Sequence, residues 1–87
     1  MIIRREKSFD KSYIKLNERH KKKVDKAIRL FMKDPYNKKL RNHALKGSKL
    51  GIRSLDIAFD LRILFIEESE YTLVLLLDVG THSKLYN

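Results

Sequence analysis

The sequence contains no cysteine, no tryptophan, one proline and three glycines. Because there is no cysteine, disulfide bridges and thiolate metal sites are excluded. No apolar run approaches the ~18 residues that a membrane-spanning helix requires. The first residues, from Met1 to Lys7, contain neither a long apolar stretch nor a small-residue cleavage site. We therefore expect a soluble, cytoplasmic protein.

The length of 87 residues and the apolar content of 43% allow one compact core. A chain of this size is too short for two independently folded units, so we expect a single domain over residues 1–87. Any functional site then lies on the surface or in a shallow cleft.

Positive charge is concentrated in the first half of the chain. Residues 1–50 contain 17 Lys and Arg against 5 Asp and Glu, whereas residues 51–87 contain 3 against 6. Such a surface favours a polyanion, and nucleic acid or the ribosome is the most natural target. An anionic membrane is the competing target.

The first 16 residues predict a short strand followed by a helix. Residues 2–6 are apolar and β-branched before they become charged, which is typical of a short first strand. Ser8 or Asp10 can cap a helix of about ten residues. One apolar stripe follows at helical spacing: Phe9, Tyr13 and Leu16.

A second helix begins near Asn17 or His20 and ends at about Asp34, because Pro35 disfavours helical backbone in the residue before it. Its apolar stripe consists of Val24, Ala27, Ile28, Phe31 and Met32. The two helices should form an antiparallel hairpin.

Residues 36–50 are basic, contain Gly47 and predict a loop that can include a helical turn. Strand formers then fill residues 51–59, 61–67 and 71–79, which indicates an antiparallel meander of three strands. The expected fold class is α+β: an N-terminal strand, the helical hairpin and the meander. Side chains alternate along a strand, so the all-apolar face with Leu61 packs on the helices. Arg62 then lies on the opposite face.

The three histidines, His20, His43 and His82, lie 23 and 39 residues apart, which matches no compact metal-ligand motif. We expect no metal and no other cofactor. His43 lies in the basic loop and His82 directly follows the last strand. A rigid sheet can orient such loop residues, although each histidine alone is more typical of an ordinary surface residue.

RNA can be cleaved without a metal when a base deprotonates the 2′-hydroxyl, an acid protonates the leaving 5′-oxygen and cations neutralise the phosphorane. Imidazole suits the proton transfers, arginine suits phosphate oxygens, and tyrosine can stack on a base. The chain contains all these types: His43, Asp60, Arg62, His82 and Tyr86.

Residues 42–86 also carry short motifs in a recognisable order. They are Asn42-His43-Ala44-Leu45-Lys46-Gly47, then Gly51-Ile52-Arg53, then Asp60, then Gly80-Thr81-His82 followed by Leu85-Tyr86. With the preceding basic hairpin, this order resembles the YafQ branch of the RelE/ParE superfamily of toxins from type II toxin-antitoxin systems.

The resemblance implies a ribosome-dependent endoribonuclease (an mRNA interferase) that enters the 30S decoding site, meets rRNA and cuts mRNA, thereby inhibiting translation. It places His43, Asp60 and His82 on family site residues. Tyr86 falls on a family aromatic position and Arg62 on a phosphate-stabilising arginine of the RelE branch.

The remaining basic residues complete the implied substrate-binding surface. The resemblance places Arg53 on a basic position of the preceding strand, and the predicted RNA-binding set adds Lys46, Lys49, Lys21, Lys22 and Lys23. Our mechanistic hypothesis has His82 as general acid, Asp60 or His43 as base or base-orienter, and the arginines on the phosphate.

Two positions depart from the family pattern. Asp56 stands where the YafQ branch often has another histidine, and Leu61 stands where it has tryptophan. Either Asp56 or Asp60 then takes the second proton role, or the protein is a weak or inactive member. The resemblance also implies a cognate antitoxin that covers basic surface in a toxin-antitoxin hetero-oligomer.

Several alternatives stay open at this stage. Arg62 could form a cross-strand ion pair with Asp78 or Asp56, and the run from Lys21 to Lys23 could be a solvated helix face. A ParE-like toxin that acts on DNA gyrase without nuclease chemistry is the second function, and a catalytically dead antitoxin-binding module is the third. Membrane binding is disfavoured because the apolar stripe of the second helix is needed to cover the sheet.

Overall fold

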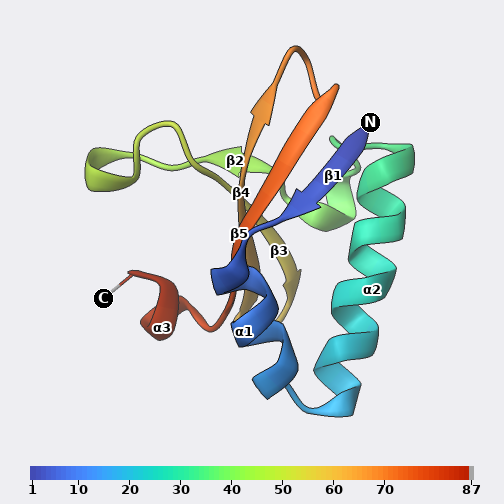
Figure 1. Ribbon diagram of the computed structural model, residues 1–87, viewed down its shortest axis with the longest axis vertical. Coiled ribbons are helices and arrows are strands. Elements are labelled where there is room, and N and C mark those ends of the chain that lie inside the picture. The colour runs from blue at the N-terminus through green and yellow to red at the C-terminus, as the bar shows by residue number, and fades with distance from the viewer. Residues whose placement is uncertain (87) are drawn as a thin grey trace.

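The computed structural model describes residues 1–86 and contains one five-stranded sheet. Its elements are β1 (Ile2–Arg5), α1 (Lys7–Lys15), α2 (Glu18–Lys33), η1 (Lys38–Leu40), β2 (His43–Ala44), η2 (Gly47–Lys49), β3 (Arg53–Ala58), β4 (Leu61–Glu68), β5 (Leu73–Gly80) and α3 (His82–Tyr86). The strand order is β1-β5-β4-β3-β2 (Figure 1). β1 runs parallel to β5, and every other pair is antiparallel. The predicted α+β fold and meander are confirmed.

α1 does not begin as predicted. The N-cap is Glu6, whose side chain makes no capping bond, so the proposed caps Ser8 and Asp10 are wrong. Ser8 instead lies inside the helix and donates its hydroxyl hydrogen to the carbonyl of Leu77. Asp10 forms an ion pair with Arg5 at 3.2 Å. Because tertiary partners satisfy both polar side chains, neither is needed as a cap.

α2 follows the prediction closely. The Asn17 side chain accepts a hydrogen bond from the His20 backbone N–H at 2.7 Å, which makes Asn17 the N-cap. The helix ends at Lys33 with Asp34 as its C-cap, directly before Pro35. The Tyr13 hydroxyl donates to Asp25 at 2.8 Å and ties α1 to α2.

The core lies between the helices and one face of the sheet (Figure 1). Phe31 of α2 and Phe65 of β4 are fully buried and meet edge to face, with ring centroids 5.0 Å apart. Leu61 and Ile63 of β4 are also buried, whereas Arg62 between them is only half-buried. This confirms the predicted face assignment, since it leaves Arg62 on the side away from the core.

Residues 36–50 are more ordered than the predicted loop. Two 3-10 turns flank β2, which pairs with β3 through His43 opposite Ser54 and Ala44 opposite Arg53. His43 therefore lies on an edge strand. A strand of only two residues has no side-chain alternation to detect, which is why the sequence did not reveal it.

The segment after β5 is a helix and not the predicted loop. α3 and the segment around η2 lie on the side of the sheet away from α2, at the left of Figure 1. No helix among residues 1–86 is both long enough and apolar enough to span a bilayer.

Candidate functional site

A cleft of about 700 Å³ gathers most of the predicted site residues. It is lined by Arg41, Asn42, His43, Leu45, Lys46, Lys49, Asp56, Arg62, His82 and Tyr86. A second hollow of about 580 Å³ adds Asp60 and shares four of these residues, namely Arg41, Asp56, Arg62 and His82. The two hollows are therefore adjacent, and we call them together the groove; residues of β2, β3, β4 and α3 line it.

The charge of the cleft favours an anionic ligand. It is lined by four cationic side chains and one carboxylate. The cations belong to Arg41, Lys46, Lys49 and Arg62, and the carboxylate belongs to Asp56. This arrangement suits the closely spaced charges of a phosphodiester backbone.

His43 is oriented by a backbone carbonyl. Its Nδ1 lies 2.6 Å from the carbonyl oxygen of Arg41, which accepts a hydrogen bond when Nδ1 is protonated. In the neutral ring this tautomer leaves Nε2 with its lone pair. The side chain is exposed, so Nε2 is available to accept a proton from a ligand in the cleft.

Asn42 anchors the segment that carries His43. Its amide nitrogen donates to the Pro35 carbonyl at 3.0 Å and to the Tyr71 hydroxyl at 2.9 Å. Its amide oxygen accepts from Nε of Arg53 at 2.9 Å. Partial burial raises the pKa of the Tyr71 phenol. Sequence reasoning quoted Asn42 in a motif and missed this anchoring role.

Arg62 forms the cross-strand ion pair with Asp56 rather than with Asp78. Nε of Arg62 lies 3.0 Å from Oδ1 of Asp56, and Nε of Arg41 lies 3.6 Å from Oδ2. Both carboxylate oxygens of Asp56 are thus next to guanidinium groups. Asp78 pairs instead with Lys84. A substrate phosphate that binds Arg62 must compete with Asp56.

Asp60 connects the β3–β4 turn to α3. Its Oδ1 accepts the backbone N–H of His82 at 3.0 Å and lies 3.4 Å from Nη1 of Arg62. The residue adopts the left-handed conformation, with φ at 54°, which an aspartate tolerates better than most residues do. The carboxylate therefore holds His82 by its backbone and lies beside the guanidinium of Arg62.

α3 presents two aromatic rings to the cleft. His82 and Tyr86 lie one helical turn apart, and their ring centroids are separated by 4.4 Å. Nζ of Lys49 lies 5.8 Å from the Tyr86 ring centroid, within the range of a cation–π contact. The predicted residue Lys49 is therefore a neighbour of Tyr86 on α3, although the two residues come from distant parts of the chain.

Four predicted RNA-binding residues are not part of this cleft. Arg53 lies opposite the buried Phe65 in the sheet and contacts Asn42 and the Tyr36 ring, so its guanidinium supports the fold. The other three are Lys21, Lys22 and Lys23 of α2. Nζ of Lys21 lies 3.5 Å from Glu18 on the same helix. The three lysines lie away from the cleft because α2 packs on the core face of the sheet.

Two features at the groove escaped sequence reasoning. Arg41 lines both hollows, and its place directly before Asn42-His43 was the only available signal. The Phe59 side chain lines the second hollow and is 99% exposed. An aromatic residue within a strand-forming run ordinarily predicts burial, so the sequence pointed away from this position.

The arrangement can perform acid-base chemistry on a bound phosphodiester. Two imidazoles, two guanidinium groups and a phenol line one basic cleft. Among residues 1–86, no three His, Asp or Glu side chains cluster closely enough to hold a metal ion. The side chains in the cleft are of the types that can transfer protons and stabilise negative charge.

Comparison with known protein families gives a match over the whole chain. The family model described as bacterial toxin of type II toxin-antitoxin system, YafQ, matches residues 1–87. None of the curated proteins compared with the chain is detectably similar.

Solved structures share the fold. YafQ from Escherichia coli strain BL21(DE3) superposes with a TM-score of 0.83 at 20% identity, covering 98% of this chain and 97% of that chain. A chain of the E. coli DinJ-YafQ toxin-antitoxin complex gives a TM-score of 0.80 at 20% identity, with 98% and 96% covered. A YoeB/ParE toxin from Agrobacterium tumefaciens gives 0.78 at 19% identity, with 94% and 99% covered.

Proposed function

The chain belongs to the YafQ family of bacterial toxins of type II toxin-antitoxin systems, and from that premise we propose that it is a metal-independent, ribosome-dependent endoribonuclease that cleaves mRNA. The observation that carries the proposal is the convergence of His43, Arg62, His82 and Tyr86 in one basic cleft. A toxin that acted by binding alone would have no need for two imidazoles at that place.

The reaction begins with proton removal from the 2′-hydroxyl by Nε2 of His43. This base is favoured because its Nδ1 is committed to the Arg41 carbonyl. The 2′-oxygen then forms a bond to phosphorus and the bond from phosphorus to the 5′-oxygen breaks. Protonated His82 gives its proton to that leaving oxygen. The products are a 2′,3′-cyclic phosphate and a 5′-hydroxyl end.

The remaining residues bind and orient the substrate. Arg62 neutralises the phosphorane, while Lys46 and Lys49 contact the flanking phosphates. Tyr86 stacks on a base next to the scissile phosphate. Asp60 serves as an orienting residue, since its carboxylate holds the His82 backbone.

A cognate antitoxin is the proposed protein partner. E. coli YafQ, which this chain resembles in fold, is found in a complex with DinJ. An acidic antitoxin segment would complement the cationic side chains that line the cleft and would block access to them. Before capture the toxin would act in the cytoplasm, where ribosomes and mRNA are present.

One observation favours a second function. Both oxygens of Asp56 lie next to arginines, and Leu61 is 1% exposed within the core. Where other members have a histidine and a tryptophan at the site, this chain has an ion pair and a core residue. A catalytically impaired module that still binds its antitoxin is therefore the alternative.

The test is to induce the protein without a partner and to map mRNA 5′ ends. Comparison with His82→Gln and His43→Gln should show cleavage reduced by about 10²–10⁴-fold, the usual contribution of a proton-transfer group. His20→Gln is the matched control, because His20 lies on α2, outside the cleft lining.

Cuts at in-frame positions in the wild type and the control support ribosome-dependent cleavage. Undiminished cleavage by His82→Gln would refute the assigned mechanism. Growth arrest with intact mRNA would point to a ParE-like action on DNA gyrase, and absence of both cleavage and arrest would support the impaired module.

A further inference from the structure

α3 is too short to hold itself in place. It spans five residues, His82–Tyr86, and an isolated helix of that length is not stable in water. Apart from the bond from the His82 backbone N–H to Asp60, its contacts are the Thr81 cap, which accepts the Lys84 backbone N–H at 3.2 Å, and the burial of Leu85. Because α3 carries both His82 and Tyr86, whatever anchors this helix also places the two rings.

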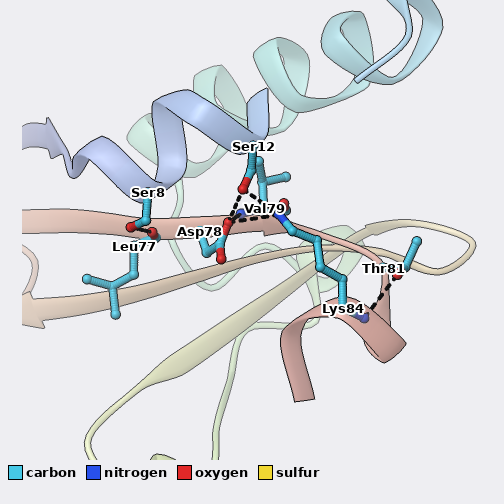
Figure 2. Close-up of polar contacts among 7 residues, drawn as sticks. All are labelled: Ser8, Ser12, Leu77, Asp78, Val79, Thr81 and Lys84. Carbon is cyan, nitrogen blue, oxygen red and sulfur yellow. Dashed lines mark hydrogen bonds and ion pairs between the residues drawn. The ribbon is translucent and has the colours of Figure 1, made fainter. Parts of the chain in front are cut away.

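The Lys84 side chain provides such an anchor. Its ammonium group donates to Oδ1 of Asp78 at 3.2 Å, to the carbonyl of Val79 at 3.0 Å and to the hydroxyl of Ser12. Ser12 in turn donates to Oδ1 of Asp78 at 2.5 Å. Figure 2 shows the lysine reaching from α3 across to Asp78 on β5 and Ser12 on α1. One side chain thus joins three elements.

Gly80 makes room for this lysine. A Cβ atom added at Gly80 would lie 2.8 Å from Cδ of Lys84, closer than such atoms approach in real structures. The ammonium end is held by three acceptors, so the lysine would have to change its side-chain torsions to make room for such an atom. Glycine at position 80 therefore leaves space for the Lys84 side chain, which a larger residue would crowd.

The lysine and the two rings point in different directions from α3. Residues four apart share a helix face, and a residue midway between them projects from the other side. His82 and Tyr86 line the cleft, whereas Lys84 reaches α1 and β5. Anchoring the far side of the helix fixes which side faces the substrate.

We propose that Lys84, together with Ser12 and Asp78, forms a positioning clamp that holds α3 so that His82 and Tyr86 face the cleft. The consequence for catalysis rests on the proposed ribonuclease function, but the clamp itself does not. Lys84 is a positioning residue, because its ammonium group contacts protein acceptors and does not line the cleft.

The competing assignment for Lys84 is a direct phosphate contact. Its bonds to Asp78, Val79 and Ser12 argue against this, since an RNA phosphate would have to displace them. The two assignments predict different effects of removing the ammonium group. A clamp changes the mobility of α3 in the absence of RNA, and a phosphate contact changes only the affinity for RNA and its dependence on salt.

The experiment compares the full-length wild type with Lys84→Met, which keeps the side-chain length and removes the charge. Lys11→Met is the matched control, because Lys11 is an exposed lysine of α1. Two properties are measured by NMR in the free protein: amide exchange at Leu85, whose N–H donates to the Thr81 carbonyl, and the contact between the His82 and Tyr86 rings. Cleavage of RNA is measured as kcat and KM.

In Lys84→Met we expect amide exchange in α3 to become about tenfold faster and the contact between the rings to weaken, while β4 amides are unchanged. We expect kcat to fall by up to about 10²-fold with little change in KM, because misplacement of a reacting group affects the chemical step. Lys11→Met should match the wild type in every measurement.

Unchanged α3 exchange and unchanged ring contacts in Lys84→Met would overturn the clamp, and an effect confined to RNA affinity would establish the phosphate contact instead. If Lys84→Met does not fold, Ser12→Ala is the second variant. It removes one acceptor of the Lys84 ammonium group, and we expect the same changes with smaller magnitude. A wild type that cleaves no RNA would refute the proposed function, and the NMR comparison would still decide the clamp.

Discussion

Replacement of Asp56 by asparagine should strengthen binding of a nucleic acid to the cleft. In the folded protein a phosphate can use Arg62 fully only after it displaces Asp56, whose Oδ1 lies 3.0 Å from Nε of the arginine. The asparagine side chain retains the shape of the carboxylate and lacks its charge. The arginine would then be free of its principal anionic partner.

The size of the effect follows from the burial of the pair. The side chains of Arg62 and Asp56 are 25% and 18% exposed, so solvent screens their interaction only in part. A charged hydrogen bond in such surroundings contributes on the order of 1–2 kcal/mol. Since about 1.4 kcal/mol corresponds to tenfold in an equilibrium constant, we expect Kd to fall about tenfold. The pair with Arg41 adds little, because that side chain is 75% exposed.

The assay is fluorescence anisotropy with a 2′-O-methyl oligonucleotide, which binds like RNA and cannot be cleaved by 2′-hydroxyl attack. Asp34→Asn is the control, since it makes the same change in net charge at an exposed position beyond α2. Equal affinity of the two variants would refute the competition argument. In cleavage assays, Asp56→Asn should retain kcat if His43 is the base, and a loss of kcat would assign the proton transfer to Asp56.

Two further predictions concern aromatic residues. Phe59→Ser should leave thermal stability unchanged, because the ring is 99% exposed, and should weaken oligonucleotide binding, because stacking of a base contributes about 1–3 kcal/mol; unaltered anisotropy titrations would contradict this. The pKa of Tyr71 is raised by burial, so the native state keeps this proton at a pH where the unfolded chain releases it. The resulting stability is fully present below about pH 10 and is lost as pH rises through the folded pKa. Urea unfolding at pH 9 and pH 11 should therefore show a smaller loss of unfolding free energy in Tyr71→Phe than in the wild type, and an equal loss would refute the assignment.

The sequence predicted those parts of the fold that depend on local patterns. The Asn17 cap and Pro35 delimit α2 because both act on the backbone within a few residues. The position of Arg62 away from the core followed from alternation along β4. Its partner could not be chosen, since pairing with Asp56 depends on strand register.

The remaining parts of the site depend on contacts between distant residues. β2 exists because His43 and Ala44 pair with β3, not because of their own propensities. α3 is held by Lys84 and by the bond from the His82 backbone to Asp60, 22 residues away. Neither contact leaves a periodic trace in the sequence. The residue types in the cleft were therefore predictable from the sequence. The hydrogen bonds that position these residues were not.

The parallel pairing of β1 with β5 has a consequence for biosynthesis. Ile2 of β1 lies opposite Leu73 of β5. β1 is synthesised first and can pair only after β5 has been synthesised. α3, with His82 and Tyr86, is translated later still. Contacts of such long sequence separation form only after the intervening chain has emerged. A nascent chain therefore has no complete cleft until α3 has been synthesised and packed against the sheet.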